Sequence, residues 1–437
     1  MRKILPLFSL LLLALVPARE LKYISVIESV LDGDRMGADV VSVGDVNGDG
    51  YTDMLVCAEG SYSTADYPGK AYLYLGGISF NEEPTLVLTG EKPADHFGVS
   101  ATGLGDINGD GFDDFAVAAD RNDEAGTDAG KVYIYLGGKT LDGEADIVLF
   151  GARSNNWFGN SISGGQDVNN DGVPDLLVGA PYGGRKYGGV VNLYLGGKDW
   201  KTPALVLSGE TAGDSYGSEV RMLGDVNGDG VSDFAVSAVY ASTESANHSG
   251  IVYIYAGGSV VSSNPIAKLT GKLPREQLGY SICSQIDITG DGVNDIVVGA
   301  PGGGPGGMGA AYVFSGGQVV RNEPALKYFG QHRNDLFGIS ISPAGDFNGD
   351  GFTDVMIGAP YTDAGSYHAG RVEIYPGGKN ASNERIFHLN GSTEEDQCGF
   401  NVSYIPGFFG KGKGLYAITC AGAGSGNIGK SRILLYR

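Results

Sequence analysis

Hydrophobic and polar positions recur along the chain in a fixed order from residue 36 onward. Each unit begins with an aromatic or apolar residue followed by glycine, such as Phe97-Gly98, and continues into a short strand of small and apolar residues. A loop rich in Asp, Asn and Gly follows, and then a continuous apolar run such as Leu176–Pro181, which predicts a buried strand. A variable segment leads to a third strand that alternates and ends in Gly-Gly, and a short fourth strand such as Ala204–Ser208 completes the unit. The pattern predicts four β-strands per unit, and no unit shows a helical period.

The unit repeats at an almost constant spacing. Six polar loops begin 58 to 62 residues apart, and a seventh, degenerate unit follows at Cys398–Arg437. Four short antiparallel strands per unit at a fixed period are typical of propeller blades. We therefore predict an all-β fold, a seven-bladed β-propeller with four antiparallel strands per blade, in which residues 19–437 form a single domain.

The seventh unit has only three strands of its own because the chain ends at residue 437. The segment Lys22–Ile27 is strand-like and precedes the first unit, where every other unit is preceded by the fourth strand of the previous blade. An unpaired strand at the edge of a sheet is an aggregation hazard. We therefore expect Lys22–Ile27 to complete blade seven and close the ring.

The polar loops carry the candidate chemistry. In Asp45–Asp53, side-chain oxygens occupy positions 1, 3, 5 and 9, glycines occupy positions 4 and 6, and position 7 can offer its carbonyl. Calcium takes six to eight oxygen ligands, mostly carboxylates and carbonyls, so each loop predicts a Ca²⁺ site and the chain about six ions. The candidate ligands are Asp45, Asn47, Asp49, Tyr51, Asp53, Asp106, Asn108, Asp110, Phe112, Asp114, Asp167, Asn169, Asp171, Val173, Asp175, Asp225, Asn227, Asp229, Val231, Asp233, Asp287, Thr289, Asp291, Val293, Asp295, Asp346, Asn348, Asp350, Phe352 and Asp354.

Two alternatives to these calcium loops need weighing. An EF-hand requires Glu at position 12, where the first loop has Val56 and the others Val or Ile. Metal-free turns are the second alternative, since Asp, Asn and Gly favour turns. Three unpaired Asp in one tight loop repel each other without a cation, which favours the metal interpretation. Thr289 replaces Asn at position 3 of loop five, so that site is expected to be weaker, and the seventh loop, Gly407–Gly414, has no carboxylate and is expected to hold no metal.

The formal net charge of −21 is concentrated in these loops. Three aspartates in each of six loops account for 18 of the 51 acidic residues, and the remaining 33 nearly balance the 30 Lys and Arg. The acidity is therefore local and directed at metal. No cluster of Lys and Arg offers a footprint for nucleic acid.

The first residues predict export. Met1–Ala18 has a basic start, an apolar core and a small-residue cleavage site, as in a secretory signal peptide. No later stretch is apolar enough to span a membrane, so a secreted or cell-surface location is predicted. Asn247, Asn380, Asn390 and Asn401 fit the N-glycosylation pattern.

Four cysteines remain in the chain. Cys57 and Cys420 occupy matching positions in neighbouring blades, which should lie too far apart for a disulfide. We therefore expect free buried thiols, with Cys283 and Cys398 at other positions of the repeat.

The three motifs together resemble the FG-GAP repeats of integrin alpha-subunit heads. They are Phe-Gly, then Asp-x-Asn-x-Asp-Gly-x-x-Asp, then Gly-Ala-Pro, and the resemblance covers essentially the whole chain after Ala18. It implies a seven-bladed propeller whose cation loops join the first and second strands on one face. It also implies that ligands and partner subunits meet the opposite face.

Three classes of function remain open. The first is a Ca²⁺-stabilised extracellular binding or adhesion module for a protein or glycan, with Trp157, Tyr182, Tyr187 and Tyr361 as ligand-contacting residues, because Tyr and Trp are common at binding hot spots. The second is a secreted propeller enzyme acting on carbohydrate or lipid, and the third a structural surface component. The chain has no zinc-type His pair, Gly-x-Ser-x-Gly elbow or dinucleotide fingerprint, which favours the first class.

Overall fold

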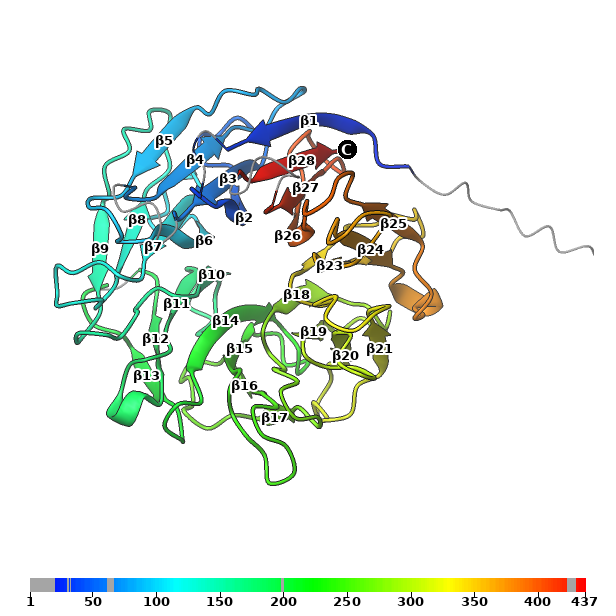
Figure 1. Cartoon of the computed structure of the whole chain (residues 1–437). Helices are drawn as coiled ribbons and strands as arrows, with labels where there is room; N and C mark the ends of the chain where they lie inside the picture. Colours follow the sequence, from blue (N-terminus) through cyan, green and yellow to red (C-terminus); the bar gives the residue numbers. More distant parts are fainter. Residues whose placement is uncertain (1–19, 30, 32, 61–66, 198–199, 423–429) are drawn as a thin grey trace, which may run out of the picture.

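The computed structural model describes residues 20–29, 31, 33–60, 67–197, 200–422 and 430–437. The predicted signal peptide, Met1–Ala18, lies outside these residues. Among the described residues, 28 strands form seven four-stranded antiparallel sheets arranged around a common axis (Figure 1). The predicted all-β, seven-bladed propeller is confirmed.

Blades one to six take their strands in chain order from the axis outward. Blade one consists of β2 (Met36–Gly44), β3 (Asp53–Ala58), β4 (Lys70–Tyr74) and β5 (Leu86–Thr89). Blade two consists of β6 (Phe97–Gly105), β7 (Asp114–Ala119), β8 (Lys131–Tyr135) and β9 (Ile147–Phe150). Blade three consists of β10 (Ile162–Gln166), β11 (Asp175–Ala180), β12 (Val190–Tyr194) and β13 (Leu205–Ser208). Blade four consists of β14 (Tyr216–Gly224), β15 (Asp233–Ala238), β16 (Ile251–Tyr255) and β17 (Ala267–Thr270). Blade five consists of β18 (Ile282–Ile286), β19 (Asp295–Ala300), β20 (Ala310–Phe314) and β21 (Leu326–Phe329). Blade six consists of β22 (Ile341–Pro343), β23 (Val355–Ala359), β24 (Arg371–Tyr375) and β25 (Phe387–Asn390). Two short 3-10 turns, η1 (Arg185–Tyr187) and η2 (Gly378–Asn380), lie in connections.

The hydrophobic core lies between neighbouring blades. Every residue of a second strand such as β3 is buried, which explains the uninterrupted apolar runs in the sequence. Leu55 of blade one packs in one cluster with Phe97 and Tyr133 of blade two. Gly98 has φ +91°, and a Cβ on it would lie 2.8 Å from the carbonyl oxygen of Lys70 in the previous blade. The aromatic-Gly pair thus fills the gap between blades and lets their backbones approach closely.

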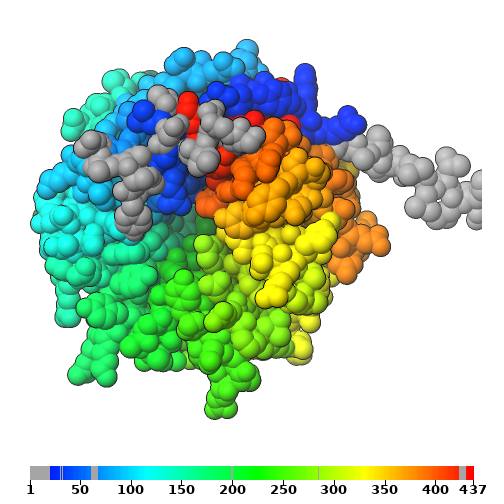
Figure 2. All heavy atoms as spheres, in the orientation of Figure 1, coloured from blue at the N-terminus to red at the C-terminus, as the bar shows by residue number. Residues whose placement is uncertain are grey.

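Blade seven is completed from both ends of the chain. It contains β26 (Cys398–Ile405), β27 (Leu415–Cys420), β28 (Arg432–Tyr436) and the N-terminal β1 (Tyr23–Glu28), which pairs antiparallel with β28. In Figure 2 the blue N-terminal segment lies against the red and orange C-terminal part of the ring. The predicted closure by the N-terminal strand is confirmed.

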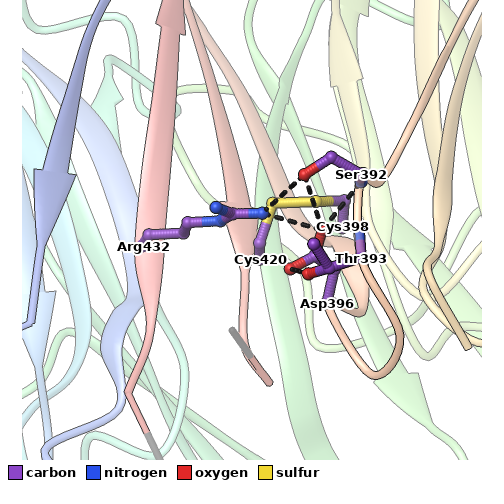
Figure 3. The surroundings of a disulfide bond; sticks show 6 residues. All are labelled: Ser392, Thr393, Asp396, Cys398, Cys420 and Arg432. Atoms are coloured by element: carbon purple, nitrogen blue, oxygen red, sulfur yellow. Dashed lines mark hydrogen bonds and ion pairs between the residues drawn. A yellow bond between two sulfur atoms is a disulfide. The ribbon is translucent and has the colours of Figure 1, made fainter. Parts of the chain in front are cut away.

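The prediction that all cysteines are free thiols is wrong for one pair. Cys398 and Cys420 form a disulfide that joins the first two strands of blade seven, whereas Cys57 and Cys283 are free and buried (Figure 3). The prediction considered a bond only between cysteines at matching positions of neighbouring blades, such as Cys57 and Cys420. The two bonded cysteines instead face each other across the β26–β27 ladder within one blade.

We expect loss of this disulfide to destabilise the protein by about 3 kcal/mol, the value for closing a loop of this length in the unfolded chain. Cys398→Ser combined with Cys420→Ser should lower the denaturation midpoint, and added reductant should lower that of the parent. Cys57→Ala is the control, and this variant should keep the parent's sensitivity to reductant. Alkylation of the unfolded, unreduced protein should modify two of its four cysteines by mass spectrometry; four modified cysteines would contradict the bond.

Candidate metal centres and the opposite face

All six acidic loops lie at the same end of the ring. Each connects the first strand of its blade to the second, as Asp45–Asp53 connects β2 to β3. Because the strands are antiparallel, the segments that follow each second strand emerge at the opposite end. The position expected for the loops is therefore confirmed.

Side chains of the first loop are organised around its own backbone. Asp45 Oδ1 accepts hydrogen bonds from the backbone N–H groups of Gly48 (2.8 Å) and Asp49 (3.0 Å), and Asp45 Oδ2 accepts one from Gly50 (2.8 Å). Asp49 Oδ1 accepts one from Tyr51 N–H at 3.0 Å. Asn47 Nδ2 donates to Asp49 Oδ2 at 3.0 Å, which brings the side chains at positions 3 and 5 together. Positions 1, 3 and 5 thus share one tight turn.

Two of these hydrogen bonds recur in every acidic loop. In all six, the N–H at position 6 donates to Oδ2 of the first Asp, at 2.7 to 3.0 Å. In all six, the N–H at position 7 donates to the Asp at position 5, at 2.9 to 3.1 Å. The six loops therefore share the same turn at positions 5 to 7, whereas the side chain at position 3 bonds to position 5 in loops one, two, three and six and to position 9 in loops four and five.

The Asp at position 9 has a second role that sequence reasoning did not anticipate. Asp53 is fully buried, and its carboxylate accepts hydrogen bonds from Val46 N–H (2.9 Å) and Gly76 N–H (2.8 Å). It therefore ties the loop to the turn after the third strand. Burial raises the pKa of Asp53 to about 7, and the negative charges of Asp49 and Asp45 add to this shift. Burial likewise raises the pKa of Asp114, Asp175, Asp233 and Asp354 to about 6.

The donor set of these loops suits a hard cation. Each loop places carboxylate, amide and carbonyl oxygens within nine residues, which is the chemistry that Ca²⁺ prefers. A carboxylate oxygen that accepts one hydrogen bond keeps a further lone pair for a metal. Asp45, Asp49 and Asp53 form no ion pair with any basic side chain among the described residues. However, no group of three or more His, Cys, Asp or Glu side chains in the described part of the chain is assembled as a metal cage.

The predicted ligand-contacting residues lie at the end opposite the acidic loops. The structure brings two of them together, because the ring centroids of Trp157 and Tyr182 are 4.4 Å apart in an edge-to-face arrangement. The guanidinium of Arg121 lies 4.3 Å from the Trp157 ring centroid. Arg121, Trp157 and Tyr182 therefore form one cluster, which we call the aromatic cluster.

The other two predicted residues lie apart from this cluster. Tyr187 is in η1 and is 62% exposed, so its ring is available to solvent. Tyr361 follows β23 and contacts His368, with ring centroids 5.0 Å apart, while Tyr367 stacks on the same histidine at 3.8 Å. Sequence reasoning placed all four on one face but could not group them.

One set of repeated acids was missed in the sequence. A carboxylate stands two residues before the aromatic-Gly pair, or its apolar or cysteine counterpart, in six blades, and Asn156 takes its place in blade three. Asp396 is an example: it is fully buried, accepts hydrogen bonds from Ser392 and Thr393, and pairs with Arg432 at 2.7 Å (Figure 3). These acids hold the turn between blades, and their fixed spacing was the signal that could have identified them. The set is Asp34, Asp95, Asp214, Glu276, Asp335 and Asp396.

The fold and the loops define a β-propeller whose blades each repeat the same acidic turn, except in blade seven. The family described as FG-GAP repeat matches residues 38–74, 97–135, 158–194, 222–255, 278–314 and 337–375, about half of the chain. The chain therefore belongs to the FG-GAP repeat family. The six matches fall on blades one to six, and the structure adds the seventh blade.

Integrin alpha subunits are among the curated relatives of this chain. The chain is 30% identical to integrin alpha-5 of Xenopus laevis over 271 residues, which is 58% of this chain and 25% of that protein. It is 37% identical to integrin alpha-3 of Cricetulus griseus over 164 residues, covering 35% of this chain and 15% of that protein. It is 39% identical to integrin alpha-IIb of Mus musculus over 168 residues, covering 36% and 16%. The matched part of the chain spans a quarter or less of these relatives.

Proposed function

We propose that this protein is a calcium-stabilised extracellular binding or adhesion module that engages a protein or glycan through the face opposite its acidic loops. The observation that carries the proposal is the aromatic cluster, because it presents two aromatic rings and a guanidinium on a rigid ring. Tyr, Trp and Arg dominate the energetics of most protein interfaces. The acidic loops are nearly identical to one another, so they have little capacity to specify a partner.

Calcium in this proposal has a structural role. The ions would be held by the oxygens at positions 1, 3, 5, 7 and 9 of each loop, where they supply positive charge among crowded carboxylates. The likeness to integrin alpha subunits supports a binding role over an enzymatic one. Export through the segment Met1–Ala18 is part of the same proposal, as is the glycosylation of surface asparagines.

The described residues contain no helix long and apolar enough to cross a bilayer.

We expect alanine substitutions in the aromatic cluster to weaken binding strongly without affecting the fold. Trp157→Ala and Tyr182→Ala should each cost about 2 kcal/mol or more, roughly a 30-fold loss in affinity, as for interface hot spots. Tyr187→Ala and Tyr361→Ala test whether the interface extends across the face. The measurement is an array of extracellular proteins and glycans probed in calcium-containing buffer, followed by calorimetric titration of the ligand identified.

The matched control is Ile78→Ala. Ile78 is an 83% exposed apolar residue in the turn after β4, at the same end of the ring as the acidic loops. This variant should bind like the parent. If binding survives all four face substitutions and is lost with Ile78→Ala, the ligand contacts the loop end and the face assignment is wrong.

A further inference from the structure

A channel runs along the axis of the ring. The first strands of all seven blades line it (β2, β6, β10, β14, β18, β22 and β26), and its volume is about 880 Å³. Figure 1 shows these inner strands converging on the centre. Small-molecule sites in proteins are typically 300 to 1,000 Å³, so the channel is large enough for a ligand.

Serine and threonine recur along the channel wall, and several of them hold neighbouring blades together. Ser100 Oγ accepts a hydrogen bond from Ile162 N–H of the next blade at 3.0 Å, and Ser161 Oγ accepts one from Val220 N–H at 3.1 Å. A backbone N–H of the next blade also donates a hydrogen bond to the hydroxyl of each of Thr102, Ser163, Ser340 and Ser342. These residues stand three or five positions after the aromatic residue of their unit, and both positions face the channel. The usual residue at each of these two wall positions is therefore a Ser or Thr that binds the neighbouring blade.

Two blades depart from this rule with charged residues. Asp39 replaces the serine in blade one, and Glu219 and Arg221 replace both hydroxyl residues in blade four. Asp39 still accepts Ala101 N–H at 3.0 Å, whereas Glu219 pairs with Arg221 at 2.6 Å and accepts Ser161 Oγ–H at 3.1 Å. Asp39, Glu219 and Arg221 are the only charged side chains among the described residues of the channel wall.

The charges are not required by the fold, because the other blades are tied together without them. Burial raises the pKa of Asp39 to about 6, so this carboxylate is held in an environment that disfavours its charge. Arg221 is 41% exposed, and the exposed part of its guanidinium has access to the channel. A carboxylate and a guanidinium are thus available to a molecule in the channel.

Gln285 is a third departure, and it carries backbone strain. Its φ of +59° lies in the left-handed region that favours glycine. The other five blades with acidic loops all have a glycine with positive φ within the two residues before the loop: Gly44, Gly105, Gly165, Gly224 and Gly345. A side chain in this conformation costs on the order of 1 to 2 kcal/mol. Gln285 adds an exposed amide to the channel wall, and strain of this kind commonly accompanies function.

We propose that the axial channel binds a neutral or singly cationic carbohydrate of one to three sugar units through Asp39, Glu219, Arg221 and Gln285. Sugar hydroxyls both donate and accept hydrogen bonds, so they suit a wall on which carboxylate, guanidinium and amide groups alternate. The three charged residues sum to one negative charge, which disfavours phosphates and acidic sugars. Tyr280, also in the wall and 44% exposed, offers a ring face to pack against a sugar.

This site is distinct from the aromatic cluster and does not depend on what the opposite face binds. None of Arg121, Trp157, Tyr182, Tyr187 and Tyr361 lines the channel. A glycan that contacts only the aromatic cluster would support the proposed function and contradict the channel site.

The test uses variants that restore the residue of the sister blades. Asp39→Ser, Arg221→Ser, the double variant Glu219→Ser/Arg221→Ser, and Gln285→Gly each install what another blade already has at that position, so folding should be preserved. Calorimetric titration of the full chain with lactose, cellobiose, maltotriose, glucosamine and sialyllactose should show binding of at least one of the first four. The double variant should weaken that binding by about tenfold or more, the loss expected for hydrogen bonds to charged groups, and Gln285→Gly should weaken it by up to about tenfold, the loss expected for a neutral hydrogen bond.

Melting curves separate binding from stability. Gln285→Gly should melt at or above the parent's temperature because it removes strain. Ser340→Ala is the wall control: it loses one tie between blades, so it should melt earlier but bind the sugar like the parent. Trp157→Ala should also bind the sugar like the parent.

Three outcomes would overturn the channel site. The first is that none of the four uncharged or cationic sugars binds the full chain. The second is that sialyllactose or inorganic phosphate binds in preference to them. The third is that the Glu219→Ser/Arg221→Ser variant, folded by its melting curve, keeps the parent's affinity.

Discussion

Deleting residues 21–28 will open the ring and lower the melting temperature of the protein. The deletion removes β1, which pairs with β28 from Tyr23↔Tyr436 to Glu28↔Arg432. It also removes the backbone hydrogen bonds between Lys22 and Arg437, at 2.9 and 3.0 Å. The edge of β28 is then unpaired and open to other chains, so aggregation should rise in parallel. Differential scanning calorimetry and light scattering at several concentrations measure both effects.

A point substitution tests the same closure with less disturbance. Ile27 is 7% exposed and packs in one cluster with Met36 of blade one and Ile433 of blade seven, so it joins the two blades. Ile27→Ala should cost about 2 to 5 kcal/mol, as for other buried isoleucines. The matched control is Val87→Ala, at a 42% exposed β-branched residue on the outer strand β5, which should change stability by less than about 0.5 kcal/mol. If the truncated protein melts like the parent and stays monomeric, the N-terminal strand does not close the ring.

Most of the fold was accessible from the sequence because the same pattern is repeated. A single apolar run such as Leu176–Pro181 is ambiguous between a strand and a buried helical segment. Its recurrence between an acidic loop and an alternating strand removes the ambiguity, since only a blade satisfies all the patterns together. The role of Lys22–Ile27 followed from counting, because blade seven lacked one strand.

The features that could not be predicted depend on which residues face each other in the folded blades and turns. The Cys398–Cys420 disulfide requires the register between β26 and β27, whereas the sequence comparison related positions in different blades. The Asp and Glu that stand two residues before the aromatic-Gly pair, or its counterpart, in six of the seven blades were missed because their partners also depend on the folded turn. Their hydrogen-bond partners lie in the turn between two blades, as Ser392 and Thr393 do for Asp396.

The candidate sites were predictable in part. The position of the acidic loops followed from the repeat. The second role of Asp53 did not, because Gly76 donates to it from the turn after the third strand, 23 residues further on. The charged residues of the channel could not be recognised as a group from the sequence. Asp39, Glu219 and Arg221 lie in two first strands that are far apart in the sequence, and only the ring places them around one axis.

Removing calcium will lower the melting temperature, by the largest amount that we expect from any change of buffer. A cation that binds only the folded state stabilises it by about 2.7 kcal/mol per site when its concentration is a hundred times the Kd. With six such loops, the melting temperature should rise steadily with calcium and fall when a chelator is added. Calorimetric titration should count about six ions. Loop five should be the weakest, since Thr289 replaces Asn and directs its hydroxyl towards Asp295 at 3.4 Å.

Two substitutions in one loop separate metal binding from folding. Asp49→Asn keeps an oxygen that can accept the Tyr51 N–H, and the lost hydrogen bond from Asn47 is offset by weaker repulsion among the aspartates of the loop. The chelated protein should therefore keep its stability, and the response to calcium should fall by about one site. Asp53→Asn replaces one of the two acceptors that hold the N–H groups of Val46 and Gly76, so it should destabilise the protein with and without calcium. Lys411→Ala, in the seventh loop, is the control and should leave the calcium response intact. If the melting temperature changes neither with chelator nor with Asp49→Asn, the six loops are turns without metal.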